Sequence, residues 1–361
     1  MKGIQRNLYP GGNTPQGFYS YYNYILTQKK AEKIFCIKGG PGVGKSTLMK
    51  QIWEYFLNKG ENVDYLWCSS DADSIDGVLM RERNVAIIDA TSPHIVDPVT
   101  PGAVDEIINL GTFWDEYELR KNKKSIMCSS EIIKSFFGMA YCYLLCASVH
   151  YDFMTDNLSH LIDDNMLCET VDSINSSFGE IRKRGSEPGK RKKLFASAIT
   201  PGGLKNGFES MVQNIDNIVI LEVPVGFRTE TVMKPIADKF VRSGFEIEEF
   251  YCPMDPEKKL EHIIVPSVKT AFLSSNKFHI VADLNYTSKY KIAVDRKNNE
   301  LIYDIYSEQL DAAENDIMSA VRMLKCAKAQ HDALEKYYID AMDFSKIADL
   351  KNKIIDNIEM L

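Results

Sequence analysis

Apolar and polar positions divide this chain into short strand-like runs and longer helical segments. Residues 34–37 and 85–88 are uninterrupted apolar runs of the length expected for buried strands in a parallel sheet. Beyond residue 47, apolar residues recur three and four positions apart on one face of a helix: Leu48, Met49, Ile52, Tyr55 and Phe56. Gly60 marks the expected end of that helix. These alternating elements predict an α/β protein.

The chain also repeats itself at a spacing of about half its length. Residues 3–15, GIQRNLYPGGNTP, match residues 189–201, GKRKKLFASAITP, at an offset of 189 − 3 = 186. Residues 37–52 match residues 221–236 at an offset of 221 − 37 = 184. Small loop insertions would produce the difference between the two offsets. Such self-similarity predicts that one α/β unit occurs twice.

Each copy ends in helical sequence, roughly at 126–180 and 307–361. We predict two tandem three-layer α/β/α units with mainly parallel sheets, each followed by a helical segment. The expected domains are residues 1–185 and 186–361, with the boundary in the charged stretch 182–193. That stretch carries Gly and Pro, and is either an exposed linker or a lid whose Arg or Lys reaches bound phosphates.

The composition narrows the class of protein. A net charge of −7 argues against a general nucleic-acid binder, whose surface would be basic. The N-terminus lacks the apolar core of an export signal, and the longest apolar run, Phe136–Val149, is interrupted and too short to span a bilayer. We therefore expect a cytoplasmic protein without a membrane span, in which this run forms a buried helix.

The eight cysteines form no CxxC pair and lie mostly in apolar segments, as at Cys36, Cys68 and Cys146. Buried free thiols in a reducing cytoplasm explain that pattern without disulfides. Cys142, Cys146 and His150 share one face of the expected helix, but three ligands along one helix rarely converge on one metal ion. We expect them to pack in the core.

A glycine-rich loop follows the first apolar run. It satisfies G-x-x-x-x-G-K-[ST] between a strand and a helix, and it reads Gly39, Gly40, Pro41, Gly42, Val43, Gly44, Lys45, Ser46 and Thr47. Glycines let the backbone point successive N–H groups at phosphate oxygens, and the helix N-terminus adds its positive dipole. Lys45 would contact the β- and γ-phosphates, and Ser46 would offer a hydroxyl to Mg²⁺. The loop therefore predicts binding of a nucleoside triphosphate, ATP with Mg²⁺.

Carboxylates after neighbouring strands complete the candidate catalytic set with Lys45. Asp89 ends the run 85–88 and is the candidate to hold Mg²⁺, directly or through water. Asp71 and Asp73 lie in the acidic loop 69–77 after another expected strand, where they would position a water or a substrate hydroxyl. A solvated loop is the alternative for that segment, with a turn or helix cap as the duty of Asp71.

The second copy lacks this chemistry. Three residues of the expected site are replaced together: Lys45 by Thr229, Ser46 by Glu230 and Asp89 by Ser274. A carboxylate in the loop would repel phosphates, so we expect one nucleotide per chain. Asp71 and His94 keep counterparts in Asp255 and His279, which favours structural duties for both.

The loop and Asp89 resemble the P-loop NTPase superfamily. A fuller set of motifs is similar to bacterial ATPase-like proteins built from tandem P-loop units: GGNTPQGFYSYYNYI, KGGPGVGKST, CSSDADSIDGV, IIDATSPHIVDP and FASAITPGG. The resemblance covers essentially the whole chain and implies a three-layer α/β/α fold in each half. The chain departs from a two-site pattern, because residues 221–236 lack the lysine and the second glycine.

Three functions fit these residues. An ATPase in the first copy would drive a conformational change between the halves. Because Ala90 follows Asp89 in place of the water-activating Glu of many ATPases, Asp71 or Asp73 would take that duty. A phosphotransferase would act on a nucleotide or another small-molecule acceptor, and a nucleotide-dependent switch would bind a partner protein through the second copy. The sequence favours hydrolysis and names neither acceptor nor partner.

Overall fold

The first half of the chain forms a six-stranded sheet in a computed structural model that describes residues 2–94, 96–178, 181, 183–185, 187–281, 284–296 and 299–361. The strand order is β1-β5-β6-β7-β4-β8. The strands are β1 (Gln5–Leu8), β4 (Lys33–Lys38), β5 (Val63–Trp67), β6 (Ile75–Met80), β7 (Val85–Asp89) and β8 (Asp105–Asn109). In this described sheet only β6 runs antiparallel to its neighbours, so the sheet is mainly parallel, as predicted.

The second half repeats this sheet strand for strand, in the order β16-β12-β15-β14-β13-β9. Its strands are β9 (Arg191–Leu194), β12 (Asn217–Glu222), β13 (Ile247–Cys252), β14 (Asp255–Val265), β15 (Thr270–Ser275) and β16 (Ser288–Lys291). The register agrees as well, since Ile37 pairs with Asp89 in the first sheet and Leu221 pairs with Ser274 in the second. The internal repeat is therefore confirmed in strand order and in register.

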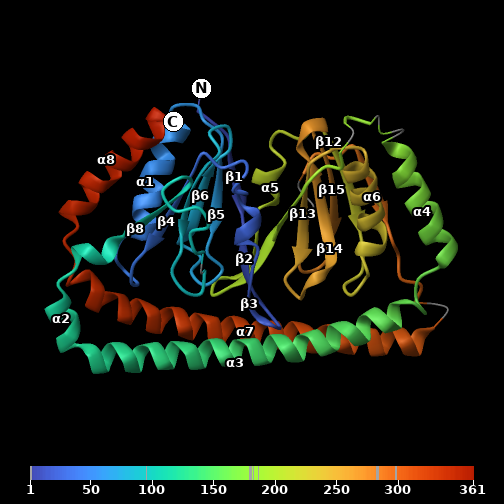
Figure 1. The fold of residues 1–361 in the computed structure, drawn as a ribbon. Coiled ribbons are helices and arrows are strands. Elements are labelled where there is room, and N and C mark those ends of the chain that lie inside the picture. Colours follow the sequence, from blue (N-terminus) through green and yellow to red (C-terminus); the bar gives the residue numbers. More distant parts are fainter. Residues whose placement is uncertain are drawn as a thin grey trace.

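Helices cover the outer face of each sheet and also cross between the halves (Figure 1). α1 (Lys45–Asn58) lies on the first sheet and α6 (Glu230–Arg242) on the second. α3 (Lys123–Leu158) and α7 (Glu300–Ile339) run antiparallel across one end of both sheets, since Gln330 bonds to Ser129 and His150 to Gln309. The shorter helices and turns beside these elements are η2 (Leu110–Phe113), α2 (Glu116–Lys121) and η3 (Pro266–Val268).

The helix that ends each copy packs on the opposite half. α4 (Asp164–Ser177) follows α3 and lies against the second sheet, where Phe178 contacts Phe240 and Phe272. α8 (Ser345–Met360), at the C-terminus, packs beside α1 in the first half. The predicted domains 1–185 and 186–361 are a division of the sequence; in space, each exchanges its last helix with the other.

The inner faces of the two sheets share one core. Apolar side chains of β4, β5 and β7 meet those of β12, β14 and β15, and two short helices, η1 (Tyr22–Tyr24) and α5 (Phe208–Met211), lie among them. Each sheet therefore has long helices on one face only, and the predicted three-layer unit is wrong in that respect. The sequence pattern shows that both faces of a strand are apolar, but it does not show whether a helix or another sheet covers them.

Two hairpins reveal how the halves are related. β2 (Gly11–Thr14) pairs with β3 (Gly17–Ser20), and β10 (Ser197–Thr200) pairs with β11 (Gly203–Asn206). Just before these hairpins, Tyr9 and Phe195 exchange hydrogen bonds through both of their backbone N–H groups. Because these two residues match each other in the repeat, a pseudo-two-fold axis passes between them.

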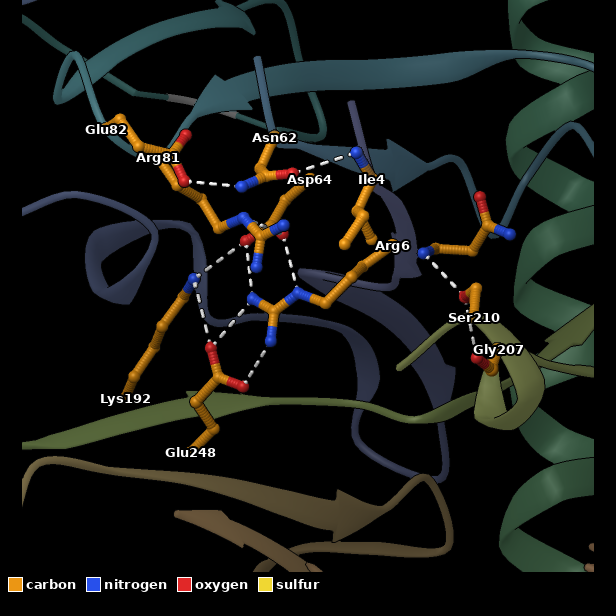
Figure 2. Close-up of polar contacts among 11 residues, drawn as sticks. Ile4, Arg6, Asn62, Asp64, Arg81, Glu82, Lys192, Gly207, Ser210 and Glu248 are labelled. Carbon is orange, nitrogen blue, oxygen red and sulfur yellow. Dashed lines mark hydrogen bonds and ion pairs between the residues drawn. The ribbon is translucent and has the colours of Figure 1, made fainter. Parts of the chain in front are cut away.

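A buried ion network joins the halves near this axis, as Figure 2 shows. Arg6 donates to Asp64 at 2.8 Å and to Glu248 at 2.7 Å, and Lys192 lies 3.4 Å from Asp64. Arg6 matches Lys192 in the repeat and Asp64 matches Glu248, so each copy supplies one cation and one carboxylate. Burial alone would raise the pKa of Asp64 and Glu248, but the charges of Arg6 and Lys192 outweigh burial and hold both values below their usual range.

The longest apolar run is helical, as predicted, but it is buried along one side only. Among the described residues, α3 is the one helix long and apolar enough to span a membrane, and most of its apolar stretch is not buried. α3 packs along one side on α7 and the ends of the sheets, so its other side faces outward.

The cysteines are also divided between buried and exposed positions. All eight are free; Cys36 and Cys68 are buried as predicted, whereas Cys142 and Cys146 are exposed on α3. The predicted core packing of these last two residues is therefore wrong. His150 lies at the edge of the α3–α7 contact and bonds to Gln309.

Candidate functional site

The glycine-rich loop joins β4 to α1, in the strand–loop–helix order that its sequence predicts. Gly42 and Gly44 have positive φ angles of 69° and 88°, which a residue with a side chain rarely adopts. Gly44 is the N-cap residue of α1, and because it has no side chain, it offers no side-chain acceptor to the first amides of the helix. Among the described residues, no protein acceptor takes the first amides of α1, at Lys45, Ser46 and Thr47. These N–H groups are therefore available as donors to an external anion.

The Lys45 side chain turns back into the loop. Its Nζ donates to the carbonyl oxygens of Gly39 at 2.9 Å and Gly40 at 2.7 Å, and lies 3.5 Å from Asp89 Oδ2. The structure thus brings together the predicted lysine and the predicted Mg²⁺ carboxylate, because β4 and β7 are neighbours whose register sets Asp89 beside Ile37.

Thr91 supports this arrangement and was not identified from the sequence. Its N–H donates to Asp89 Oδ1 at 2.9 Å, and its hydroxyl donates to the Gly39 carbonyl at 3.1 Å. The hydroxyl also accepts the N–H of Gly39 at 3.3 Å. Thr91 therefore ties the end of β7 to the start of the loop. Its position two residues after Asp89, where an Asp side chain can cap the backbone, was the available signal.

Ser46 lies on the first turn of α1 and faces the acidic loop. Its Oγ accepts the N–H of Ile75 at 3.1 Å, so the hydroxyl proton remains free to turn elsewhere. Ser46 thereby links α1 to β6. The site residues of the loop are held by β4, α1, β6 and β7 together.

The acidic loop places Asp71 and Asp73 differently. Asp71 Oδ1 accepts the N–H of Asp73 at 3.0 Å, which is an Asx turn, and Oδ2 lies 3.4 Å from Lys328 on α7. Asp73 has an exposed side chain, and its backbone carbonyl accepts from Lys50. The turn duty suggested for Asp71 is present, and its partner from the second copy was not foreseen.

The end of α7 and the start of α8 close over the loop. A Cβ atom on Gly40 would lie 2.5 Å from the ring of Tyr338, and one on Gly42 would lie 2.9 Å from the carbonyl oxygen of Glu335. A Cβ on Gly44 would meet Ile347 at 3.2 Å. The glycines are thus required by close packing as well as by backbone conformation. The second copy covers the loop of the first.

The matched loop in the second half is filled by protein. Gly226 keeps the positive φ of 88°, but its carbonyl accepts from Thr155 at 2.8 Å, and the Val225 carbonyl accepts from Tyr306 at 3.1 Å. Phe227 is buried, and Glu230 stands at the first position of α6. Burial raises the pKa of Glu230. The second loop therefore keeps the positive φ of its glycine, but it lacks the lysine and the open helix amides of the first loop.

A groove of about 580 Å³ lies beside this second loop. It runs between the end of α3 and the start of α4, and its lining includes Arg228, His160, Asp156 and Asp164. Arg228 lies 3.8 Å from Asp156. Because the two carboxylates offset the basic groups, this groove does not provide the cationic environment that a triphosphate requires.

His94 belongs to a buried polar cluster near Asp89. His94 Nε2 lies 3.5 Å from Asp76 Oδ1, and Tyr22 donates to Asp76 at 2.8 Å. Burial raises the pKa of Asp76, with Asp89 adding to the shift, although His94 opposes it. The second half keeps an acid and a histidine at the matched places, Glu261 and His279, 3.9 Å apart. Since this pair occurs in both halves, the structure agrees with a shared structural duty for His94.

The described part of the charged linker lies against the second half. Arg184 N–H donates to the Ser243 carbonyl, and Gly189 N–H donates to that of Val241, both at the end of α6. Arg182 and Ser186 lie outside the described residues. Arg191, Lys192 and Lys193 form part of β9 in the second sheet, and Lys192 also reaches Asp64 of the first half. Among the described residues of this segment, no basic side chain forms an ion pair with the loop of the first half.

Similarity to a known family concerns the segment that contains the loop. The sequence profile of the family described as Nephrocystin 3, N-terminal matches residues 19–79, which run from β3 to β6. This match covers less than half of the chain and marks a similarity of one segment. No curated protein and no solved structure matched the chain.

Proposed function

We propose that the loop Gly39–Thr47 binds the phosphates of ATP with Mg²⁺, as a P-loop does, and that the first half hydrolyses ATP. The observation that carries this proposal is the position of the Lys45 ammonium, held by loop carbonyls 3.5 Å from Asp89 and beside the first amides of α1. Amides of a helix N-terminus and a mobile cation are the groups that bind a polyphosphate.

The donor set around Asp89 fits Mg²⁺. The Asp89 carboxylate and the Ser46 hydroxyl are hard oxygen ligands, which this ion prefers. One Asp89 oxygen is held by Thr91, and the other faces Lys45, so the side chain is already oriented. A bound Mg²⁺ would neutralise phosphate charge, while Lys45 would hold the β- and γ-phosphates.

A second candidate function is a nucleotide-dependent switch with little turnover. The observation favouring it is the contact of α7 with the loop, through Tyr338 at Gly40 and Glu335 at Gly42. α7 also lies along the second half, so a nucleotide that displaced Tyr338 would move an element common to both halves. Hydrolysis and switching share the binding step and differ in turnover.

Two measurements on the purified chain test these functions. Binding of a fluorescent ATP analogue with and without Mg²⁺ tests the site, and phosphate release from ATP tests turnover. Release without an added acceptor supports the ATPase, and tight binding without release supports the switch. Phosphate transfer that occurs only when an acceptor is added would make the protein a phosphotransferase. Absence of nucleotide binding would overturn the proposal.

A further inference from the structure

The outward face of α3 carries an apolar strip that nothing in the described chain covers. Its large apolar side chains are between 36% and 57% exposed: Met127, Ile132, Met139, Tyr143, Leu145, Val149 and Phe153. No charged residue occurs from Ser135 to Val149. At about 1.5 Å per residue, the charge-free part of the strip, from Ser135 to Val149, is ~21 Å long. Contiguous apolar surface of this extent marks an interaction site.

The neighbouring helix shows that this composition is not general to the helical layer. The exposed side chains of α7 are mostly charged or polar, including Asp304, Glu308, Asp311, Arg322 and Lys325. α3 and α7 are matched helices of the repeat and lie side by side. The exposed face of α7 suits contact with water, whereas that of α3 does not. This difference points to a binding partner on α3.

A protein partner accounts for the strip better than a bilayer does. The opposite side of α3 is buried against the rest of the chain through Leu144, Ala147 and Tyr151. Insertion across a membrane would separate α3 from α7 and from both halves. Insertion of the two helices together would carry the charges of α7 into the hydrocarbon, at a cost of several kcal/mol.

We propose that the strip binds the same strip of a second copy of this chain, with the two α3 helices antiparallel. Lys134 and Asp152 flank the strip, are exposed, and make no ion pair within the described residues. They are eighteen residues apart, which is about five helical turns, so they lie on the same side of α3. Tyr143 is midway between them. An antiparallel pair centred there sets Lys134 of each copy level with Asp152 of the other.

Small residues at the centre of the strip permit close approach. Gly138, Cys142 and Cys146 are exposed and recur every four residues along α3. Interaxial distance between packed helices depends on side-chain size at the contact, so this row suits a short separation. Centring on Tyr143 also brings the two Cys142 residues within about 3 Å of each other along the helix axis, at about 1.5 Å per residue. The native thiols therefore report the pairing.

The first test is the mass of the full-length chain by light scattering over a concentration series. We expect a dimer, which Leu145→Glu converts to a monomer with unchanged circular dichroism. Met318→Glu is the matched control, because Met318 is an apolar residue exposed on α7. A chain that remains monomeric at all concentrations overturns the proposal, and so does one that binds phosphatidylglycerol vesicles as a monomer. A dimer that survives Leu145→Glu also overturns it.

Charge exchange and crosslinking test the antiparallel arrangement. Lys134→Glu alone and Asp152→Lys alone each turn two attractions into repulsions, and each should weaken the dimer about tenfold. The double variant should restore it. Mild oxidation should crosslink the wild type through Cys142, Cys142→Ser should abolish the crosslink, and Cys326→Ser on α7 should leave it. Failure of the double variant to recover, or a crosslink independent of Cys142, would show that the copies do not pair in this way.

Discussion

The loops Gly39–Thr47 and Val223–Thr231 occupy the same place in two copies of one fold, yet they present different surfaces. Each follows the strand next to the edge of its sheet and precedes a helix, and each keeps a glycine with positive φ, Gly42 or Gly226. The first holds Lys45 beside Asp89. The second has Thr229 and Ser274 at those places, with Phe227 buried in the loop.

This difference separates what the fold requires from what the proposed phosphate binding would require. The glycine with positive φ is needed for the turn and for the close passage of a helix from the other copy, so it occurs in both loops. A cation and a carboxylate are not needed for either purpose. In the buried ion network, by contrast, charge is retained in both copies because it joins the halves. The matched cations are Arg6 and Lys192, and the matched carboxylates are Asp64 and Glu248.

The largest expected effect comes from a substitution in the buried ion network, which both copies retain. Arg6→Met should lower the free energy of unfolding by about 3–5 kcal/mol, because it leaves the buried carboxylates of Asp64 and Glu248 without their main partner. Lys30→Met is the control, since the Lys30–Glu246 pair also joins the halves but is exposed, and it should cost less than about 1 kcal/mol. Urea denaturation of both variants measures the difference.

The same network predicts an acid dependence. Asp64 and Glu248 have folded pKa values below their usual range, so the stability they contribute is present above about pH 4 and is lost as the pH falls further. The stability gap between wild type and Arg6→Met should therefore narrow below about pH 4. Equal stability of Arg6→Met and Lys30→Met at neutral pH would contradict the role assigned to the network.

Lys45→Ala tests what only the first copy has. We expect ATP binding to weaken at least 100-fold, about 2.7 kcal/mol, because the charge on the β- and γ-phosphates is lost. The fold should remain, since the partners of Lys45 are loop carbonyls and Asp89. Lys50→Ala removes a lysine from the same helix and should bind as the wild type does. A folded Lys45→Ala variant that binds within about threefold of the wild type would refute the site.

Asp89→Asn should affect turnover more than binding. We expect hydrolysis to fall by about 10–100-fold and to need more Mg²⁺, with nucleotide affinity changed by about threefold or less, because the carboxylate acts through the ion. Asp97→Asn is the control, as Asp97 is an exposed acid paired with Lys38. Titration of Mg²⁺ against phosphate release compares the three proteins. Identical Mg²⁺ curves would remove Asp89 from the site.

The smallest effects are expected in the second loop. Thr229→Ala should change ATP affinity by less than about twofold, which is under 0.5 kcal/mol, because this loop has no lysine at the position of Lys45 and its one cation, Arg228, lies beside Asp156. Calorimetry with a non-hydrolysable ATP analogue should give one site per chain. Two sites of similar affinity would mean that the filled loop opens on binding and that the comparison between the loops is misleading.

The sequence by itself determined the repeat, the positions of several strands and the residues of the glycine-rich loop. These features are local or periodic: a buried parallel strand is a short apolar run, and the loop is nine consecutive residues between a strand and a helix. Asp89 could be placed as well, because a carboxylate at the end of a neighbouring parallel strand reaches the same edge of the sheet.

Only the tertiary structure decided which surfaces meet. Tyr338 lies 338 − 40 = 298 residues after Gly40, and Lys328 lies 328 − 71 = 257 residues after Asp71. An amphipathic pattern tells which face of a helix is apolar without identifying its partner. For the same reason the apolar run 136–149 was expected in the core and is exposed on α3. The hydrophobic effect favours the burial of an apolar surface, but it does not specify the surface that buries it. The arrangement of the chain decides that.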